Sequence, residues 1–138
     1  MRLGDVYTRS SDSIRQYWTL PYVPGKRSGD KPVYLLTSGF TFSGAEQFAY
    51  DLQQLKRATV VGERTRGGAH LIDVFHIQDR FQACIPTRQA TNPVSGANWE
   101  GVGVEPDIAV PAERALSVAH VEALRRVLEK RRVLHSFR

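Results

Sequence analysis

The sequence predicts an α/β fold built around a parallel strand-helix-strand unit, and three segments indicate it. Residues 32–38 (PVYLLTS) and 58–63 (ATVVGE) are short apolar runs without alternation, which is typical of strands covered on both faces. Residues 43–56 lie between these runs and carry apolar side chains three and four positions apart, which predicts an amphipathic helix. Short connections between a strand, a helix and a second strand predict parallel strands with a right-handed crossover. The stripe expected to face the core is Ala45, Phe48, Ala49, Leu52 and Leu55.

The first 31 residues precede this unit and show no sustained period of two or 3.6 residues. Prolines and glycines are frequent in residues 21–32, which favours irregular structure. We expect residues 1–31 to be an extended arm or linker remnant, with one short strand near residues 6–8, and residues 32–138 to form the folded part. The aromatic side chains in the arm would pack against another chain or another domain. They belong to Tyr17, Trp18 and Tyr22.

The second half of the chain adds a β-hairpin and a C-terminal helix. After the glycine-bearing loop RTRGGAH, residues 71–78 and 80–89 predict two further strands. Residues 90–107 form a long irregular stretch, and a loop of that length inside a compact domain is usually functional. A short strand (DIAV) follows, and Pro111 suits the first turn of a final helix. The stripe expected to be buried on that helix is Leu116, Ala119, Ala123, Leu124, Val127 and Leu128.

Composition narrows the class of protein. The apolar fraction of 41% and the charged fraction of 24% are ordinary for a soluble globular protein. No apolar run approaches the ~20 residues that cross a bilayer, and the N-terminus lacks the apolar core of a signal peptide. As written, the chain is expected to be cytoplasmic, although a longer parent could be exported. The single cysteine, Cys84, excludes an internal disulfide and a cysteine-based metal site, and we expect neither metal nor cofactor.

The net charge of +5 comes largely from the C-terminal tail. Cations are favoured at the C-terminal end of a helix, so this tail is interpreted as a solvated helix face. Nucleic-acid binding is not expected, because no aromatic stacking platform or reading motif accompanies the charge.

Ser43, in SGAE, has two interpretations. A serine followed three residues later by Glu46 matches a capping box, which contributes about 1 kcal/mol without any catalytic role. A serine between a strand and a helix N-terminus also lies at the edge where parallel sheets bind their ligands. Free helix N–H groups there would stabilise an oxyanion, but a serine still needs a base to act as a nucleophile. Spacing alone leaves both interpretations open.

Two longer stretches resemble the tail-specific (C-terminal processing) serine peptidase family. They are residues 36–70 (LTSGFTFSGAEQFAYDLQQLKRATVVGERTRGGAH) and residues 92–110 (NPVSGANWEGVGVEPDIAV). The most similar branch contains the tricorn core proteases and the interphotoreceptor retinoid-binding protein. The resemblance runs from about residue 32 to 119, and it implies a ClpP/crotonase-like fold and hydrolysis of peptide bonds in peptide or protein substrates. Family members are much longer, so residues 32–138 are expected to be the C-terminal part of a catalytic domain. The chain would then form a homo-oligomer or lack an N-terminal region.

The resemblance also implies roles for single residues. Ser43 corresponds to the nucleophile, and the backbone N–H of Gly44 would help to form the oxyanion hole. The lysine base of one branch is excluded, because Gly67 and Gly68 stand at that position. In the tricorn-like branch the base is a histidine from the N-terminal half, supported by a glutamate that corresponds to Glu100. That histidine has no counterpart here, so the chain alone is expected to be weak or inactive. Candidates for lining the site are Ser38, Gly39, Gly67, Gly68, His70 and Trp99.

Two alternatives remain open. A non-catalytic module of the same fold would bind an apolar ligand or a protein partner through its aromatic side chains, as the retinoid-binding relative suggests. A crotonase-like acyl-CoA enzyme would use paired N–H groups on a thioester, but no CoA-binding signature supports it.

Overall fold

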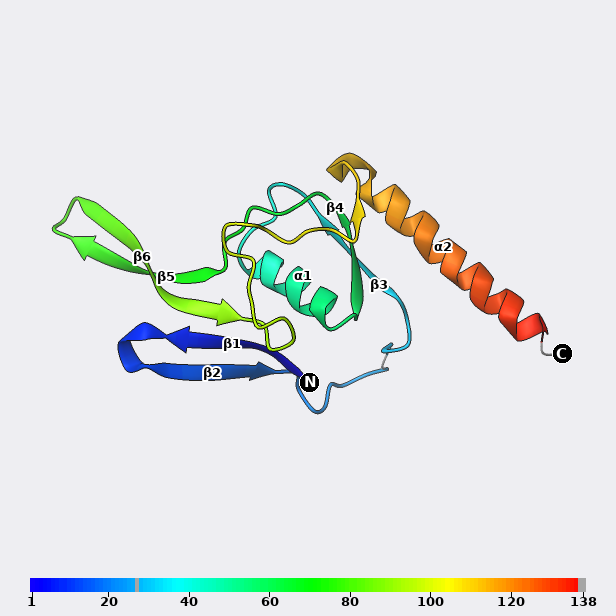
Figure 1. The fold of residues 1–138 in the computed structure, drawn as a ribbon, viewed down its shortest axis with the longest axis horizontal. Coiled ribbons are helices and arrows are strands. Elements are labelled where there is room, and N and C mark those ends of the chain that lie inside the picture. Colours follow the sequence, from blue (N-terminus) through cyan, green and yellow to red (C-terminus); the bar gives the residue numbers. More distant parts are fainter. Residues whose placement is uncertain (27, 137–138) are drawn as a thin grey trace.

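The computed structural model describes residues 1–26 and 28–136, so residue 27 of the expected arm and residues 137–138 of the folded part lie outside it (Figure 1). The strand-helix-strand prediction is confirmed: β3 (Val33–Thr37) and β4 (Ala58–Gly62) are parallel neighbours, and α1 (Gly44–Gln54) connects them. A two-residue strand, β7 (Ile108–Ala109), also runs parallel to β4. The first sheet therefore has the strand order β3-β4-β7.

The second sheet is antiparallel, with the strand order β2-β1-β6-β5. β5 (His70–Ile77) and β6 (Phe81–Thr91) form the predicted hairpin. β1 (Arg2–Thr8) and β2 (Ser13–Trp18) form another, joined by the short 3-10 helix η1 (Arg9–Ser11). β1 pairs with β6, so the N-terminal hairpin extends this sheet.

Residues 2–18 thus form a hairpin and not an extended arm, while the short strand expected near residues 6–8 lies within β1. Besides β2, the other partner strand of β1 lies more than eighty residues away along the chain, since Val6 pairs with Ala90. Local periodicity cannot detect such a pairing. Residues 19–26 and 28–32 contain neither helix nor strand.

The core lies on both faces of β4, because successive strand residues point to opposite sides. Val60 belongs to a cluster with Ala49 of α1 and Ala90 of β6, and this cluster joins α1 to both sheets. Val61 packs on the other face, against Ala115 of α2. α2 spans Ala112–Ser136. The parallel sheet thus has a helix on each face.

The apolar stripes of the two helices are less buried than their spacing predicts. On α1, Ala49 is buried but Phe48 is 57% exposed, while the charged side chains of Glu46 and Asp51 are buried. On α2, Ala119 is buried, whereas four members of the expected stripe are exposed: Leu116, Leu124, Val127 and Leu128. Figure 1 shows that α2 extends past the sheet, but Leu116 lies next to the buried Ala115, so its exposure follows from the side of the helix that it occupies. Within the described part of the chain, neither helix is apolar enough over a sufficient length to cross a membrane.

Candidate active site at the start of α1

Ser43 occupies the residue immediately before α1 and has an unusual backbone conformation. Its φ is 54° and its ψ is −122°, whereas an ordinary helix cap has extended dihedrals with negative φ. Such a conformation costs an L-residue about 1–3 kcal/mol and persists only where the surroundings impose it. A serine on a strained turn between a strand and a helix is the arrangement that exposes Oγ in the nucleophile elbow of α/β hydrolases. The conformation is therefore not explained by capping alone.

Glu46 imposes this turn. The backbone N–H of Ser43 donates to Glu46 Oε2 at 2.7 Å, which is the carboxylate half of the predicted capping box. The reciprocal contact, from the N–H of Glu46 to the serine side chain, is looser and lacks the geometry of a cap hydrogen bond. The serine Oγ is thus held less firmly than its own backbone.

The same carboxylate fastens the glycine-bearing loop beside Ser43. Glu46 is fully buried. It accepts hydrogen bonds from the Thr65 hydroxyl at 2.5 Å, from the Gly67 N–H at 2.6 Å and from the Gly68 N–H at 2.9 Å. Burial by itself raises the pKa of Glu46, but the hydrogen bonds from Thr65, Gly67, Gly68 and Ser43 outweigh it, so the pKa lies below its ordinary value. The group is an anion at neutral pH, with four donors directed at it.

The glycine-bearing loop is joined on its other side to the long loop before β7. Glu100 Oε2 accepts the N–H of Ala69 at 2.6 Å and that of His70 at 2.8 Å. The indole N–H of Trp99 donates to the carbonyl of Gly68 at 3.1 Å. Trp99 is 3% exposed, so this contact is part of the core. The two loops therefore hold the start of β5 beside the start of α1.

Ser43 lines a cavity of about 540 Å³ between these elements. Of the residues expected at the site, this cavity gathers Ser43, Gly44, Gly68, His70 and Trp99. The backbone N–H of Gly44 donates to no other described residue, so it is free to bind an oxyanion. His70 Nδ1 lies 3.9 Å from Glu100 Oε2.

The structure separates the other expected residues from the cavity wall. The Ser38 Oγ accepts the N–H of Phe40, and the Gly39 N–H donates to Glu63, so both belong to the turn after β3. Gly67 has a φ of 90° and lies against the backbone of the long loop. Glu100 accepts the N–H groups of Ala69 and His70. The expected residues that support the cavity without lining it are Ser38, Gly39, Gly67 and Glu100.

Sequence reasoning missed two features of the site. Glu46 was interpreted only as part of a helix cap, because no sequence signal links it to the loop residues some twenty positions later whose hydrogen bonds it accepts. Arg88 of β6 reaches the cavity and pairs with Asp73 at 2.7 Å, and its alternating strand position gave no indication of this.

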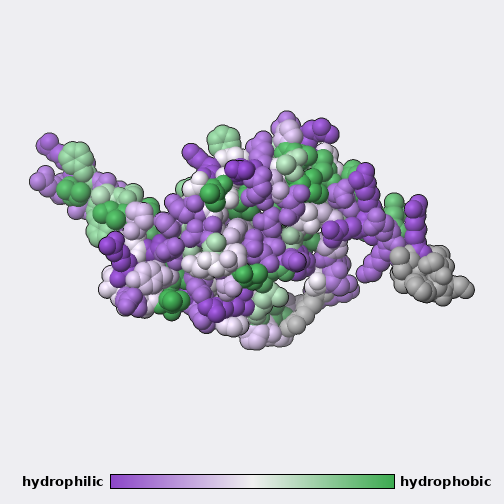
Figure 2. Space-filling view, in the orientation of Figure 1, coloured by the Kyte–Doolittle hydropathy of each residue, from purple (hydrophilic) through white to green (hydrophobic). Residues whose placement is uncertain are grey.

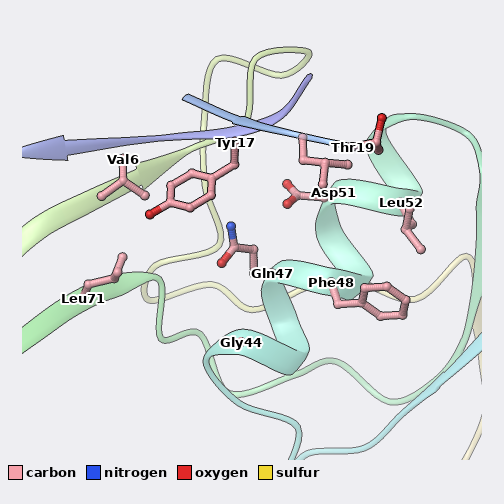
Figure 3. Close-up of a pocket in the computed structure, with 10 residues that line it drawn as sticks. Val6, Tyr17, Thr19, Gly44, Gln47, Phe48, Asp51, Leu52 and Leu71 are labelled. Atoms are coloured by element: carbon pink, nitrogen blue, oxygen red, sulfur yellow. The ribbon is translucent and has the colours of Figure 1, made fainter. Parts of the chain in front are cut away.

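A second cavity of about 530 Å³ adjoins the first, and the two share Gly44, Gln47 and Leu71. Figure 3 shows Val6 and Tyr17 from the N-terminal hairpin above the cavity and α1 below it. Its lining is mainly apolar. Asp51 is a buried exception: burial raises its pKa, and hydrogen bonds from Asn92 and Gln47 offset this only in part.

Comparison with known proteins gives a consistent family. The model of Peptidase family S41 matches residues 3–110. A carboxy-terminal-processing protease from Bartonella bacilliformis is 29% identical over 86 residues, which cover 62% of this chain and 20% of that protein. The chain thus spans about a fifth of the length of this curated relative.

Two solved structures are similar in three dimensions. The photosystem II D1 C-terminal processing protease has a TM-score of 0.62 and 26% identity, over 81% of this chain and 28% of that one. A lipoprotein from Streptococcus agalactiae has a TM-score of 0.67 over 91% of this chain and 45% of that one, and its 15% identity shows the fold alone. With the family model matched over most of the chain, including Ser43 and the two loops beside it, the chain belongs to Peptidase family S41, the tail-specific proteases, and spans part of the length of such proteins.

Proposed function

We propose that this chain is the C-terminal part of a serine peptidase catalytic domain, with a ClpP/crotonase-like core, and that Ser43 is its nucleophile. The observation that carries the proposal is the strained backbone of Ser43, with φ at 54°, in a cavity beside the free N–H of Gly44. The names of the relatives, both C-terminal processing proteases, support a peptide or protein substrate cut near its C-terminus.

The proposed reaction is acyl transfer. The Ser43 Oγ attacks the scissile carbonyl carbon while a base removes the hydroxyl proton, and the carbonyl oxygen becomes an oxyanion. The N–H of Gly44 and the positive end of α1 stabilise that charge. The amine then leaves with a proton from the base, and water hydrolyses the acyl-enzyme.

The base is the missing part. The family's base histidine has no counterpart in these 138 residues, so we expect only weak activity from the chain alone. His70 is the alternative within the chain, because it lines the same cavity as Ser43 and lies near Glu100. The proposed role of Glu100 is to orient this segment through the two N–H groups it accepts.

A fluorophosphonate probe with mass-spectrometric mapping tests the nucleophile. We expect labelling of the wild type at Ser43, faster with added imidazole as an external base, and none in Ser43→Ala. Ser38→Ala is the matched control, because the hydroxyl of Ser38 serves the neighbouring turn and its loss should leave labelling intact. Absence of labelling at Ser43 with imidazole present would overturn the assignment. A slower imidazole-free reaction in His70→Ala would identify His70 as the base.

The apolar cavity favours a second candidate, a module that binds an apolar ligand. Its wall includes Leu3, Val6, Phe48 and Leu52, and its volume suits a ligand of moderate size. Titration of Ser43→Ala with retinol or a fatty acid, with tryptophan fluorescence as the readout, tests this candidate. Saturable binding without any probe labelling of the wild type would favour it over catalysis.

A further inference from the structure

The opposite edge of the parallel sheet carries a concentration of positive charge. Lys31 lies just before β3, Lys56 and Arg57 lie just before β4, and Arg126 and Lys130 face them from α2. Together with Asp30 these side chains line a pocket of about 370 Å³, called here the cationic pocket. Figure 2 shows hydrophilic surface interspersed with apolar patches along α2.

The cationic pocket has few counter-charges. It contains five cations and one carboxylate, which leaves an excess of four positive charges. The other cations of the chain that form ion pairs within the described residues do so elsewhere, as in Arg64 with Glu105 and Arg125 with Glu122. None of the five in the pocket has a carboxylate within 4.0 Å among those residues. Crowded like charges repel each other, and a bound anion removes that repulsion.

A helix end accounts for only part of this charge. Lys56 and Arg57 follow the C-terminus of α1, where the helix dipole favours cations. Lys31, Arg126 and Lys130 come from two other segments that this dipole does not explain. Three segments distant in sequence thus bring cations to one concavity.

Two of the cations are fixed in place. The guanidinium of Arg57 donates to the carbonyl of Lys31 at 3.0 Å and to that of Ser28 at 3.4 Å, which fastens the segment before β3. The guanidinium of Arg126 lies over the ring of Tyr34, 5.8 Å from its centroid. Guanidinium groups held in this way lose little entropy on binding and match the geometry of phosphate oxygens. The lysines around them can adjust to the ligand.

We propose that the cationic pocket binds a multivalent phosphate-bearing anion, either a free phosphorylated small molecule or the phosphate headgroup of an anionic lipid. Its volume suits a compact polyanion and its charge matches several phosphate groups. The pocket lies at the N-terminal ends of β3 and β4, whereas Ser43 follows the C-terminal end of β3. A strand of this length separates the two edges by about 17 Å, so the site is independent of the proposed peptidase chemistry.

Calorimetric titration with sodium tripolyphosphate tests the site directly. We expect saturable binding by the wild type that weakens as salt is raised, because counterions are released. The double variant Lys56→Ala/Lys130→Ala should bind at least about tenfold more weakly, since it removes half of the excess charge. Arg114→Ala/Arg125→Ala is the matched control: it removes two charges from the same molecule outside the pocket and should bind as the wild type does. Thermal melts verify that both variants fold.

Vesicle flotation separates the two sources of phosphate. Phosphatidylcholine vesicles with and without phosphatidic acid, whose phosphomonoester can carry two charges, are compared for the wild type and both double variants. Binding to tripolyphosphate alone assigns a free phosphorylated ligand, and pocket-dependent flotation with phosphatidic acid assigns a lipid headgroup. The proposal is overturned if neither probe binds, or if the control variant loses as much binding as the pocket variant.

Discussion

Ser43 carries a backbone strain that its side chain does not require. A glycine at this position would relieve the strain, because it adopts positive φ without steric cost. An alanine would keep the strain and lose only the hydroxyl. The two substitutions therefore separate the energetic cost of the turn from the chemistry of Oγ.

We expect Ser43→Gly to be more stable than Ser43→Ala by about 1–3 kcal/mol, with both variants unreactive toward a serine-directed probe. Urea denaturation of the two variants, with the same slope against denaturant, measures the difference. Equal stability of the two variants would show that the turn stores no strain.

Glu46 and Asp51 are two buried carboxyls of α1 whose pKa values move in opposite directions. The pKa of Glu46 is lowered, so this group stabilises the fold above the pKa of the unfolded chain, and the contribution is lost as pH falls through the folded value. The pKa of Asp51 is raised, so its folded form binds a proton more readily than its unfolded form. The stability that protonated Asp51 contributes is therefore present below the pKa of the unfolded chain and is lost as pH rises through the folded value.

The two groups should therefore affect the free energy of unfolding differently as the pH is lowered from 7. Glu46→Gln leaves several donors facing a neutral amide and should cost about 3 kcal/mol at pH 7, with less further loss below about pH 4 than the wild type shows. Asp51→Asn, which keeps an acceptor for Asn92 at 2.8 Å, should lose less stability at pH 7 than Glu46→Gln. Free energies of unfolding between pH 3 and pH 7 measure both effects. Parallel curves for wild type and Glu46→Gln would contradict the assignment to Glu46.

At the scale of elements, the candidate site depends on the contact between the glycine-bearing loop and the loop before β7. The N–H of Val104 donates to the Thr65 hydroxyl at 2.7 Å, and the N–H of Thr65 donates to the carbonyl of Val104 at 3.2 Å. Gly103 lies at this contact with a φ of 75°, and a Cβ there would come within 2.2 Å of the Thr65 carbonyl oxygen. Gly101 has a similar φ of 71° but open space around it.

This pair of glycines gives a matched test of the contact. Gly101→Ala should cost about 1 kcal/mol for its left-handed backbone alone, and Gly103→Ala should cost several kcal/mol because it also pushes the loops apart. Chemical denaturation gives the two costs. If they are alike, close approach of the loops is not what requires glycine at residue 103.

The elements differ in how much of them the sequence reveals. The parallel unit was predictable because β3, α1 and β4 are consecutive and their apolar periods are local. The pairing of β1 with β6 was not, since it joins distant segments. The stripe of α2 was misjudged for another reason: the helix contacts the sheet through Ala115, Ala119 and Arg126, whereas Leu116 and Leu124 are exposed on other sides of the helix.

The candidate site likewise contains features that the local sequence predicts and features that depend on distant segments. Ser43 and Gly44 were predictable because one local motif places them at a strand-helix junction. The supporting roles of Glu46 and Glu100 depend on backbone groups from loops that fold against them, and neither spacing nor composition encodes those contacts. Ser38 and Gly39 were expected at the cavity because they are close in sequence, but the turn after β3 carries them away from it.

For the molecule as a whole, the main feature is exposed apolar surface. The β5–β6 hairpin projects from the body in Figure 1, and Figure 2 shows apolar side chains at that end. Phe75, Ile77, Phe81 and Ile85 lie on one face of it, since residues paired across strands share a face. All four are between 47% and 66% exposed. Apolar patches of this kind mark association surfaces.

Homo-oligomerisation thus remains a prediction. Sedimentation velocity should show association that increases with protein concentration, and Phe75→Thr/Phe81→Thr should shift the equilibrium toward monomer. Val74→Thr, on the opposite face of the hairpin, is the control and should leave association unchanged. A wild-type chain that stays monomeric at high concentration would contradict the prediction.

The two cavities share Gly44, Gln47 and Leu71 in their linings, and this has a consequence for inhibitor design. Because the cavities adjoin, one small molecule can place an electrophile beside Ser43 and an apolar tail between the N-terminal hairpin and α1. Linking two fragments that each bind weakly to one of two neighbouring cavities raises the affinity without new contacts, since the second fragment then binds intramolecularly. The tail would meet side chains of the N-terminal hairpin, including Leu3 and Tyr17, so selectivity over serine hydrolases in general would come from the first twenty residues of the chain and not from the proposed nucleophile.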